Sequence, residues 1–205
     1  MPMSLPHIAL ALTLAAATAG LAFAQGAPQR QRIRGTVESL EGTKLVIKSR
    51  SGEMVSVKLA DDWAVSAIVK ATLADIKPGA YVGAGAMPQG DGSQKAVQVL
   101  IFPEAMRGTG EGFRPWDYLP ESTMTNATVA APVTSVAGAA FSLTYKGGSQ
   151  TLVIPPDAMI ITLAQGDKAE LKPGAAVALS ADKGADGTLN ALARISVGRD
   201  GVAPN

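Results

Sequence analysis

Short apolar segments separated by turn-forming residues recur along most of the chain. Lys44 to Lys48 and Met54 to Leu59 are rich in Val, Ile and Leu, and they flank the pair Ser51-Gly52, which predicts a β-hairpin. Tyr81 to Met87 and Lys95 to Phe102 flank a glycine-rich turn, which predicts a second hairpin. The pattern therefore favours short strands joined by tight turns.

The same pattern occurs twice in the chain. Leu73 to Val82 and Lys168 to Val177 share the sequence Lys-Pro-Gly-Ala-x-Val, with an acidic residue two positions before the lysine, at an offset of 95 residues. The flanking strand positions align at an offset of 95 or 96, and the aligned pairs include Val37 with Val133 and Val99 with Arg194. An internal repeat of this length indicates a duplicated module.

Each copy also contains a helix-start pattern between its third and fourth predicted strands. Thr72 is followed by Asp75, and Asp167 by Glu170, so each copy has an N-cap residue with an acid three positions later. The Lys-Pro-Gly that follows ends such a helix after about one turn. Three strands, a helical turn and two strands is the order of an oligonucleotide/oligosaccharide-binding (OB) barrel.

The predicted fold is therefore all-β, with two tandem small five-stranded OB-like barrels, each with a short helical turn. We place the barrels at residues 32–102 and 127–198, joined by a connector at residues 103–126. Residues 25–31 and 199–205 lie outside the copies and are predicted to be disordered. Because each copy is small for an independent domain, packing of one barrel on the other is expected to add stability.

The first 24 residues have the features of a cleaved secretory signal peptide. An apolar stretch from Ile8 to Phe23 leads into Ala22-Phe23-Ala24, a small-x-small cleavage site. No Lys or Arg precedes this stretch, which departs from the usual pattern. An uncleaved membrane anchor is the alternative, but the stretch is shorter than the roughly 20 apolar residues of a spanning helix. We predict cleavage near Ala24 and a periplasmic mature protein without membrane insertion.

The amino-acid composition excludes several classes of chemistry. The chain has no Cys, which excludes disulfides, thiol catalysis, zinc–thiolate sites and the lipidated cysteine of a lipoprotein. Its single His is His7, inside the predicted signal peptide, so the mature protein would lack an imidazole for acid–base catalysis or metal binding. The 18 basic and 17 acidic residues nearly balance, so no overall field would attract nucleic acid or a membrane.

Several of these motifs resemble a known family. Arg34-Gly-Thr-Val37, Gly42-x-x-Leu45-x-Ile47, the acid-x-Lys-Pro-Gly-x-x-Val block and the Asp-Gly turn are similar to the small OB-like domain of unknown function DUF5666, found in exported bacterial proteins. The whole chain resembles exported proteobacterial proteins, some of which are catalogued as metal ABC transporter permeases. The resemblance implies an OB-like fold and an exported location, and it brings no known catalytic residues.

The connector at residues 103–126 has no counterpart in the repeat and concentrates charged and aromatic side chains. Its candidate ligand-binding or partner-binding residues are Arg107, Glu111, Arg114, Trp116 and Asp117. Alternating glycines among them permit close approach of a ligand, and the two arginines could donate paired hydrogen bonds to an anion. The alternative is structural, with the aromatic residues packing the connector against the barrels.

Two weaker candidates concern metal binding and catalysis. Asp61, Asp62 and Asp157 lie near equivalent ends of the third predicted strand, where their carboxylates offer oxygen ligands for a hard cation such as calcium. Acidic residues in such turns are more often solvated. Glu111 and Asp117 could form a carboxylate acid–base pair of the kind that glycosidases use.

The sequence thus favours a non-catalytic periplasmic binding or interaction protein, with the connector organising the site. Its partner is expected to be an unknown periplasmic protein or a small ligand, with no cofactor and no nucleic acid. The alternatives are an envelope accessory protein that handles a hard divalent metal ion, and a carboxylate-dependent enzyme.

Overall fold

The computed structural model describes residues 30–133 and 139–204, and it is all-β. The strands of the described residues are β1 (Arg30–Glu41), β2 (Lys44–Ser49), β3 (Met54–Lys58), β4 (Ala64–Lys70), β5 (Tyr81–Pro88), β6 (Gln94–Ile101), β7 (Gly112–Pro115), β8 (Thr123–Val133), β9 (Ala139–Tyr145), β10 (Gly148–Ile154), β11 (Met159–Gln165), β12 (Ala176–Lys183), β13 (Leu189–Ala191) and β14 (Arg194–Gly198). The helical elements are three 3-10 turns, η1 (Leu73–Asp75), η2 (Glu104–Met106) and η3 (Lys168–Glu170). No helix in the described ranges is long and apolar enough to cross a membrane. The predicted signal peptide lies outside these residues.

The predicted hairpins and helical turns are present. β2 and β3 pair antiparallel around Gly52, whose φ is +88°, and β5 and β6 pair antiparallel around the second turn. In η1 the Asp75 carboxylate accepts a hydrogen bond from the Thr72 backbone N–H at 2.8 Å. In η3 the Glu170 carboxylate accepts a hydrogen bond from the Asp167 backbone N–H at 2.7 Å. These caps satisfy backbone donors that a one-turn helix leaves unpaired.

A strand that the sequence pattern did not predict precedes each 3-10 turn. β4 contains four consecutive buried residues, Val65 to Ile68. A strand buried on both faces has no alternation of apolar and polar positions, so its sequence reads as a continuous apolar run. β11 occupies the same place in the second copy. Each copy therefore has four strands before the turn, which corrects the expected three.

The strand pairing also corrects the expected domain boundaries. β1, β2 and β3 form a closed five-stranded cycle with β13 and β12, which come from the second copy; we call it barrel I. β8, β9 and β10 close in the same way with β6 and β5 from the first copy; we call it barrel II. Residues 32–102 and 127–198 therefore do not each close a barrel, because the two copies exchange their last strands.

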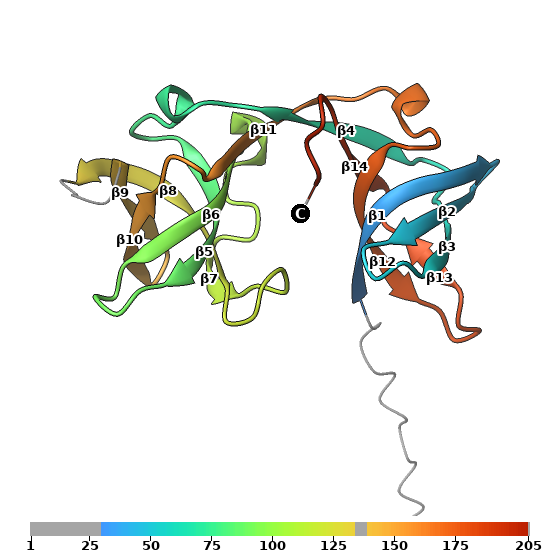
Figure 1. Ribbon diagram of the computed structural model, residues 1–205, viewed down its shortest axis with the longest axis horizontal. Helices are drawn as coiled ribbons and strands as arrows, with labels where there is room; N and C mark the ends of the chain where they lie inside the picture. The colour runs from blue at the N-terminus through green and yellow to red at the C-terminus, as the bar shows by residue number, and fades with distance from the viewer. Residues whose placement is uncertain (1–29, 134–138, 205) are drawn as a thin grey trace, which may run out of the picture.

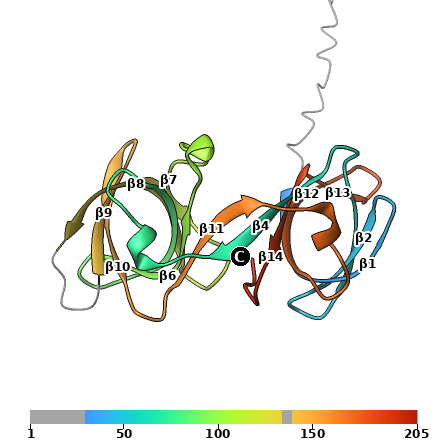
Figure 2. The same ribbon diagram turned by 90° about the horizontal axis from the view of Figure 1, so that it is seen from above.

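β4 and β11 carry the exchange. Both strands run from one barrel to the other (Figures 1 and 2). β4 pairs parallel with β14 and antiparallel with β11, and β11 pairs parallel with β6. At the centre of their antiparallel ladder Ile68 pairs with Leu163. These residues are 95 positions apart, which is the repeat offset, so an approximate two-fold axis passes through this pair.

The ladder registers correct one alignment near the start of the copies. Val37 pairs with Ile47, and Val129 pairs with Leu143. Ile47 and Leu143 align at the repeat offset of 96, so Val37 is equivalent to Val129 and not to Val133. The difference arises because the connection between β8 and β9 is longer than the turn between β1 and β2. Sequence alignment at a fixed offset cannot detect such a change in loop length.

A second correction concerns the last strand of each copy. Arg194 pairs with Ala64, and Gln98 pairs with Met159. Ala64 and Met159 align at the repeat offset of 95, so Arg194 is equivalent to Gln98 and not to Val99. In the first copy the last strand, β6, contains a bulge. In the second copy the corresponding strand is interrupted, so that it forms the two separate strands β13 and β14. A shift of one residue moves a strand position to the opposite face.

Each barrel has an apolar core built from both copies. The buried core residues of barrel I, with part of β4, are Ile33, Val37, Leu45, Ile47, Val57, Leu59, Val65, Leu171, Val177, Leu179, Ala181, Ala191, Ile195 and Val197. Those of barrel II are Ile76, Val82, Ala84, Ala86, Ala96, Val99, Ala127, Val129, Phe141, Leu143, Leu152 and Ile154. Burying one Val, Leu or Ile contributes about 1.5–3 kcal/mol, so removing the strands of either copy would open both cores.

The segment 199–204 packs between the barrels, which corrects its predicted disorder. Val202 is buried in a small cluster with Ile68 and Ile161. The Arg199 backbone N–H donates to the Ile68 carbonyl at 3.0 Å, and the Arg199 guanidinium pairs with the Glu170 carboxylate at 2.6 Å. Figure 1 shows the C-terminal end between the two barrels.

The start of the first strand is a smaller correction. β1 begins at Arg30, inside the segment 25–31 that was expected to be disordered. The Arg30 guanidinium pairs with Asp182 of β12 at 2.9 Å, and Gln31 pairs with Ala181 in the β1–β12 ladder. The ladder partner that orders these residues comes from the other copy, so the local sequence carried no signal for it. The remainder of that segment lies outside the described residues.

Candidate ligand-binding cavity between the barrels

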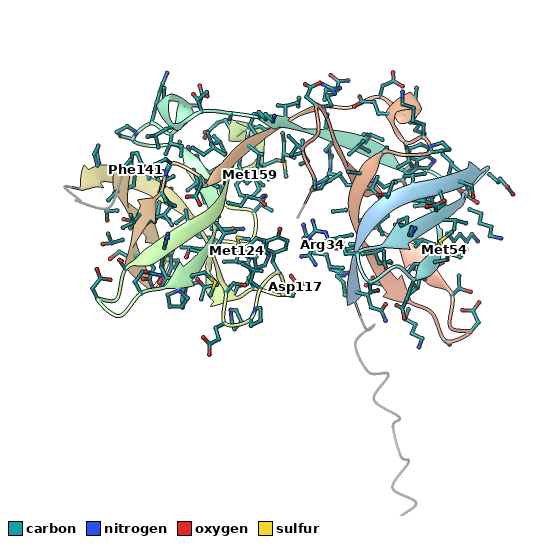
Figure 3. The ribbon with its side chains drawn as sticks, viewed as in Figure 1. Arg34, Met54, Asp117, Met124, Phe141 and Met159 are labelled. Atoms are coloured by element: carbon teal, nitrogen blue, oxygen red, sulfur yellow. The ribbon has the colours of Figure 1, made fainter. Side chains whose placement is uncertain are left out.

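A cavity of about 470 Å³ lies between barrels I and II and is bounded by the β4–β11 pair. Its walls come from β1 and β14 on the side of barrel I and from β5, β6 and β8 on the side of barrel II. The connector adds residues from η2, from β7 and from the loop after β7. Figure 3 shows Arg34 of barrel I and Asp117 of the connector facing each other between the barrels. The cavity size lies within the usual range for small-molecule sites.

One wall of the cavity is apolar. Ile68, Leu100, Ile161 and Leu163 line it from β4, β6 and β11, and they belong to the same apolar cluster as Val202. Phe102 continues this wall after the end of β6. These side chains lie where the two copies cross, so the apolar wall exists only because the strands are exchanged.

Trp116 forms part of the wall of barrel II. Its ring lies flat on the backbone of Gly85, where a Cβ atom would collide with the indole. Its backbone N–H donates to the Ser122 carbonyl at 2.8 Å, and its ring is 4.8 Å from that of Tyr118. The aromatic part of the connector therefore packs on barrel II, as the structural interpretation predicts, and it also lines the cavity. Ligand binding by Trp116 stays a prediction.

Three arginines line the cavity from different elements. Arg32 comes from β1, Arg194 from β14 and Arg114 from β7. Arg114 Nη1 donates to the Gly110 carbonyl at 2.8 Å, and Arg194 Nη1 donates to Ser66 Oγ at 2.8 Å. Desolvation lowers the pKa of Arg32, and repulsion from Arg34 and Arg114 lowers it further. The three guanidinium groups thus give the lining of the cavity a positive charge.

Asp117 is the only acid among the described residues that line this cavity. Its two carboxylate oxygens accept hydrogen bonds from Arg34 Nη1 at 3.0 Å and Nη2 at 2.7 Å. These bonds to Arg34 lower the pKa of Asp117. The Arg34–Asp117 ion pair joins the connector to barrel I. A second contact joins them as well, because the Arg50 guanidinium of barrel I lies 5.0 Å from the centroid of the Tyr118 ring. The cavity is therefore bridged on the side away from β4 and β11.

Equivalent positions of the two barrels face the cavity with different chemistry. Met124 pairs with Gly85, and Arg32 pairs with Ser180, which lies one repeat offset after Gly85. Arg32 of barrel I is thus equivalent to Met124 of barrel II. By the same registers the further pairs are Arg34 with Asn126, Arg194 with Gln98, and Ser196 with Leu100. Barrel I presents a basic face, whereas barrel II presents amide and apolar groups.

Two of the predicted connector residues lie away from the cavity. Arg107 pairs with Glu104 and donates to the Gly79 carbonyl at 2.8 Å, so it fixes η2 to the start of β5. The Glu111 carboxylate accepts the Lys146 backbone N–H at 2.9 Å, at the turn between β9 and β10. The cavity brings together Arg114, Trp116 and Asp117 of the predicted set, and it leaves Arg107 and Glu111 in structural contacts.

The geometry gives no support to the proposed acid–base pair or metal site. Asp117 and Glu111 have different partners, and the lowered pKa of Asp117 is opposite to what a general acid at neutral pH requires. Asp61, Asp62 and Asp157 lie in the turns before β4 and β11. In the part of the chain that the structure describes, no group of three or more His, Cys, Asp or Glu side chains could hold a metal ion.

Several cavity residues were missed by reasoning from the sequence. Gln98 lies inside a predicted strand, and Arg32 and Arg194 lie inside the predicted barrels, so none of the three belongs to the connector that the sequence singled out. A signal existed for Gln98, because it is an amide side chain within an otherwise apolar run from Ala96 to Ile101; in the structure it is 7% exposed. For Arg194 the signal was an arginine aligned with an apolar residue in the other copy. Gly85 gave no signal, because only the packed Trp116 ring explains it.

Comparison of the chain with models of protein families, with curated proteins and with solved structures gives no match. The chemistry that the cavity can perform therefore has to be inferred from its own side chains.

Proposed function

We propose that this protein is a non-catalytic binding protein that holds a small ligand in the cavity between two strand-exchanged OB-like barrels. The connector 103–126 helps to organise this site through Arg114, Trp116 and Asp117. The strand order around each barrel supports the OB-like description, in which strands 1, 2 and 3 are followed by 5 and 4. Export to the periplasm remains the expectation from residues 1–24.

The observation that carries this proposal is the composition of the cavity walls. Both barrels and the connector contribute side chains to one space of about 470 Å³. A space with one apolar wall and a few convergent polar groups is typical of small-molecule sites. The polar groups here are guanidinium, amide and hydroxyl groups, together with one carboxylate that Arg34 keeps ionised. This set is suited to holding a ligand rather than to transferring a proton.

A thermal-shift screen with a library of small organic molecules would test this function. A ligand that binds the folded state raises the melting temperature by mass action. Ser196→Phe would fill the cavity from β14, where Ser196 is half-buried and lines the space. Ser142→Phe is the matched control, because Ser142 is also half-buried but lies in β9 outside the cavity.

We expect stabilising compounds to shift the wild-type protein and Ser142→Phe, and to lose their effect on Ser196→Phe. Circular dichroism would establish that both variants are folded. Compounds that shift Ser196→Phe as strongly as the wild-type protein would show that binding occurs elsewhere, and the proposal would then fail.

A further inference from the structure

The cavity contains more positive than negative charge. Arg32, Arg114 and Arg194 line it, together with a single aspartate among the described residues. That aspartate, Asp117, is engaged by a fourth arginine, Arg34. Like charges held close together in a partly desolvated space repel one another. Such an arrangement is expected where a negatively charged group binds.

The structure itself shows how a carboxylate is held at this place. Asp117 reaches the arginine group from the connector, and Arg34 binds it through two nearly parallel hydrogen bonds of 2.7 and 3.0 Å. A planar guanidinium fits a carboxylate in this two-point manner, which a lysine cannot reproduce. Arg32 and Arg114 both line the cavity together with Asp117, so a second carboxylate that enters the cavity faces both guanidinium groups.

The opposite wall decides what else the ligand must carry. Ile68, Leu100, Ile161 and Leu163 offer apolar side chains beside the arginine group. Ile68 and Ile161 are already buried, so the exposed part of this wall comes from Leu100 and Leu163, which are half-buried. A small inorganic anion would leave this part in contact with water. An apolar chain of the ligand would remove it from water, which contributes roughly 25 cal/mol for each Å² buried.

We propose that the cavity binds an organic carboxylate with an apolar chain. Arg32 and Arg194 of barrel I and Arg114 on the side of barrel II share the carboxylate, and the apolar wall covers the chain. This inference rests on the proposed function, since it names the ligand class for the same cavity. The carboxylate bridges the two barrels, so the ligand strengthens the link that Arg34 and Asp117 already make.

Decanoate is a suitable probe, with decanol and acetate as comparisons. Decanol has a chain of the same length without charge, and acetate has the charge without the chain. The chain contains two tryptophans, Trp63 at barrel I and Trp116 in the cavity wall. In the Trp63→Phe protein, fluorescence reports on the cavity alone. Titrations would stay below the concentration at which decanoate forms micelles.

We expect decanoate to give a saturable change in Trp116 fluorescence, with decanol binding at least about tenfold more weakly and acetate giving no change. Because the interaction with the head group is ionic, high salt should weaken decanoate binding and leave decanol binding unchanged. Arg114→Gln or Arg32→Gln should each raise the dissociation constant of decanoate by about tenfold, as expected for loss of one charge-assisted contact.

Two matched variants serve as controls. Arg107→Gln changes an arginine of the connector that contacts Glu104 and Gly79 outside the cavity. Arg30→Gln changes an arginine of β1 that pairs with Asp182. Both should bind decanoate as the wild-type protein does. If they weaken binding as much as Arg114→Gln, the effect is one of general charge and the assignment is overturned.

The outcomes separate the ligand class from the proposed function. If decanol binds as tightly as decanoate, or if neither binds while other compounds give shifts that Ser196→Phe abolishes, the ligand class is wrong and the cavity function stands. If decanoate binds equally well to Ser196→Phe, it lies outside the cavity and the ligand class is wrong. The cavity function fails as well only if the stabilising compounds of the thermal-shift screen also act equally on Ser196→Phe.

Discussion

The two barrels have the same architecture but present different faces to the space between them. At equivalent positions barrel I has Arg32 and Arg194, where barrel II has Met124 and Gln98. The core positions differ much less, and Val37 and Val129 are each 1% exposed. Packing constrains both cores in the same way, whereas residues of the two cavity faces have different partners: Arg34 binds Asp117, and its counterpart Asn126 donates to the Thr109 carbonyl. We expect the difference between Arg32 and Met124 to affect ligand binding more than stability.

The largest expected effect concerns the independence of the two barrels. Ile47→Ala in barrel I and Leu143→Ala in barrel II should each lower the free energy of unfolding by about 2–5 kcal/mol, as core truncations do. Because each core contains strands of both copies, either substitution should shift the unfolding of the whole molecule. Single-tryptophan variants, Trp63→Phe and Trp116→Phe, would follow each barrel separately during urea unfolding.

Coincident unfolding curves from the two tryptophans, both shifted by either substitution, are the expected result. Two separate transitions, of which only one responds to each substitution, would indicate barrels closed by consecutive residues. That outcome would contradict the strand exchange on which the apolar wall of the cavity depends.

Gly85 and Ser180 provide a second comparison, since they occupy equivalent positions in β5 and β12. Gly85→Val should destabilise the protein by about 1–3 kcal/mol, because the new side chain displaces the Trp116 ring. Ser180→Val should have a much smaller effect, since Trp116 covers only the position in barrel II. Urea unfolding would measure both. If removal of the ring in Gly85→Val/Trp116→Ala does not reduce the cost of the valine, the collision is not its cause.

Met124 of barrel II is equivalent to Arg32 of barrel I, so Arg32→Met makes this position of the basic face resemble the uncharged face of barrel II. This change should weaken decanoate binding while changing the free energy of unfolding by less than about 0.5 kcal/mol, because Arg32 is exposed and the repulsion from Arg34 that the change removes is offset by the attraction to Asp117 that it also removes. The urea midpoint and the decanoate titration measure the two effects separately. A large loss of stability would mean that Arg32 is a structural residue and that the two faces differ for reasons of folding.

The smallest expected effect is on the pH dependence of the ion pair that fixes the C-terminal segment. Hydrogen bonds from Arg199, and from the Asp167 backbone, lower the pKa of Glu170 from 4.5 to about 2. A lowered carboxyl pKa in the folded state contributes stability above pH 4.5 that is lost as the pH falls towards 2. Glu170→Gln should therefore reduce the acid dependence of the urea midpoint in this range. An unchanged acid profile would contradict the role assigned to this pair.

Much of the local structure could be predicted from the sequence. The hairpins followed from apolar runs around Ser51-Gly52 and its counterparts, and the 3-10 turns followed from the Thr72 and Asp167 caps. β4 was missed because Val65 to Ile68 are buried on both faces and show no alternation. The ordered segment around Val202 was missed because its apolar partners, Ile68 and Ile161, are distant in the sequence.

The candidate site was predicted only in part. Arg114, Trp116 and Asp117 were found because they stand out in a segment with no counterpart in the repeat. Arg32 could not be assigned to the same place, because its partner strand β12 comes from the other copy. Arg194 could not be assigned either, because the alignment paired it with Val99, which lies on the opposite face from its true counterpart Gln98. A one-residue irregularity in a strand reverses every side chain that follows, and only the ladder register reveals it.

The sequence by itself determined that the chain is a duplicated set of short strands, turns and helical caps, since these depend on neighbouring residues. Only the tertiary structure decided which copy completes which barrel. The two copies share the same order of strands and turns, so a barrel closed within one copy and a barrel closed by exchange satisfy the same local preferences. The extended path of β4 and β11 selects exchange, and it thereby creates the cavity where the two copies cross.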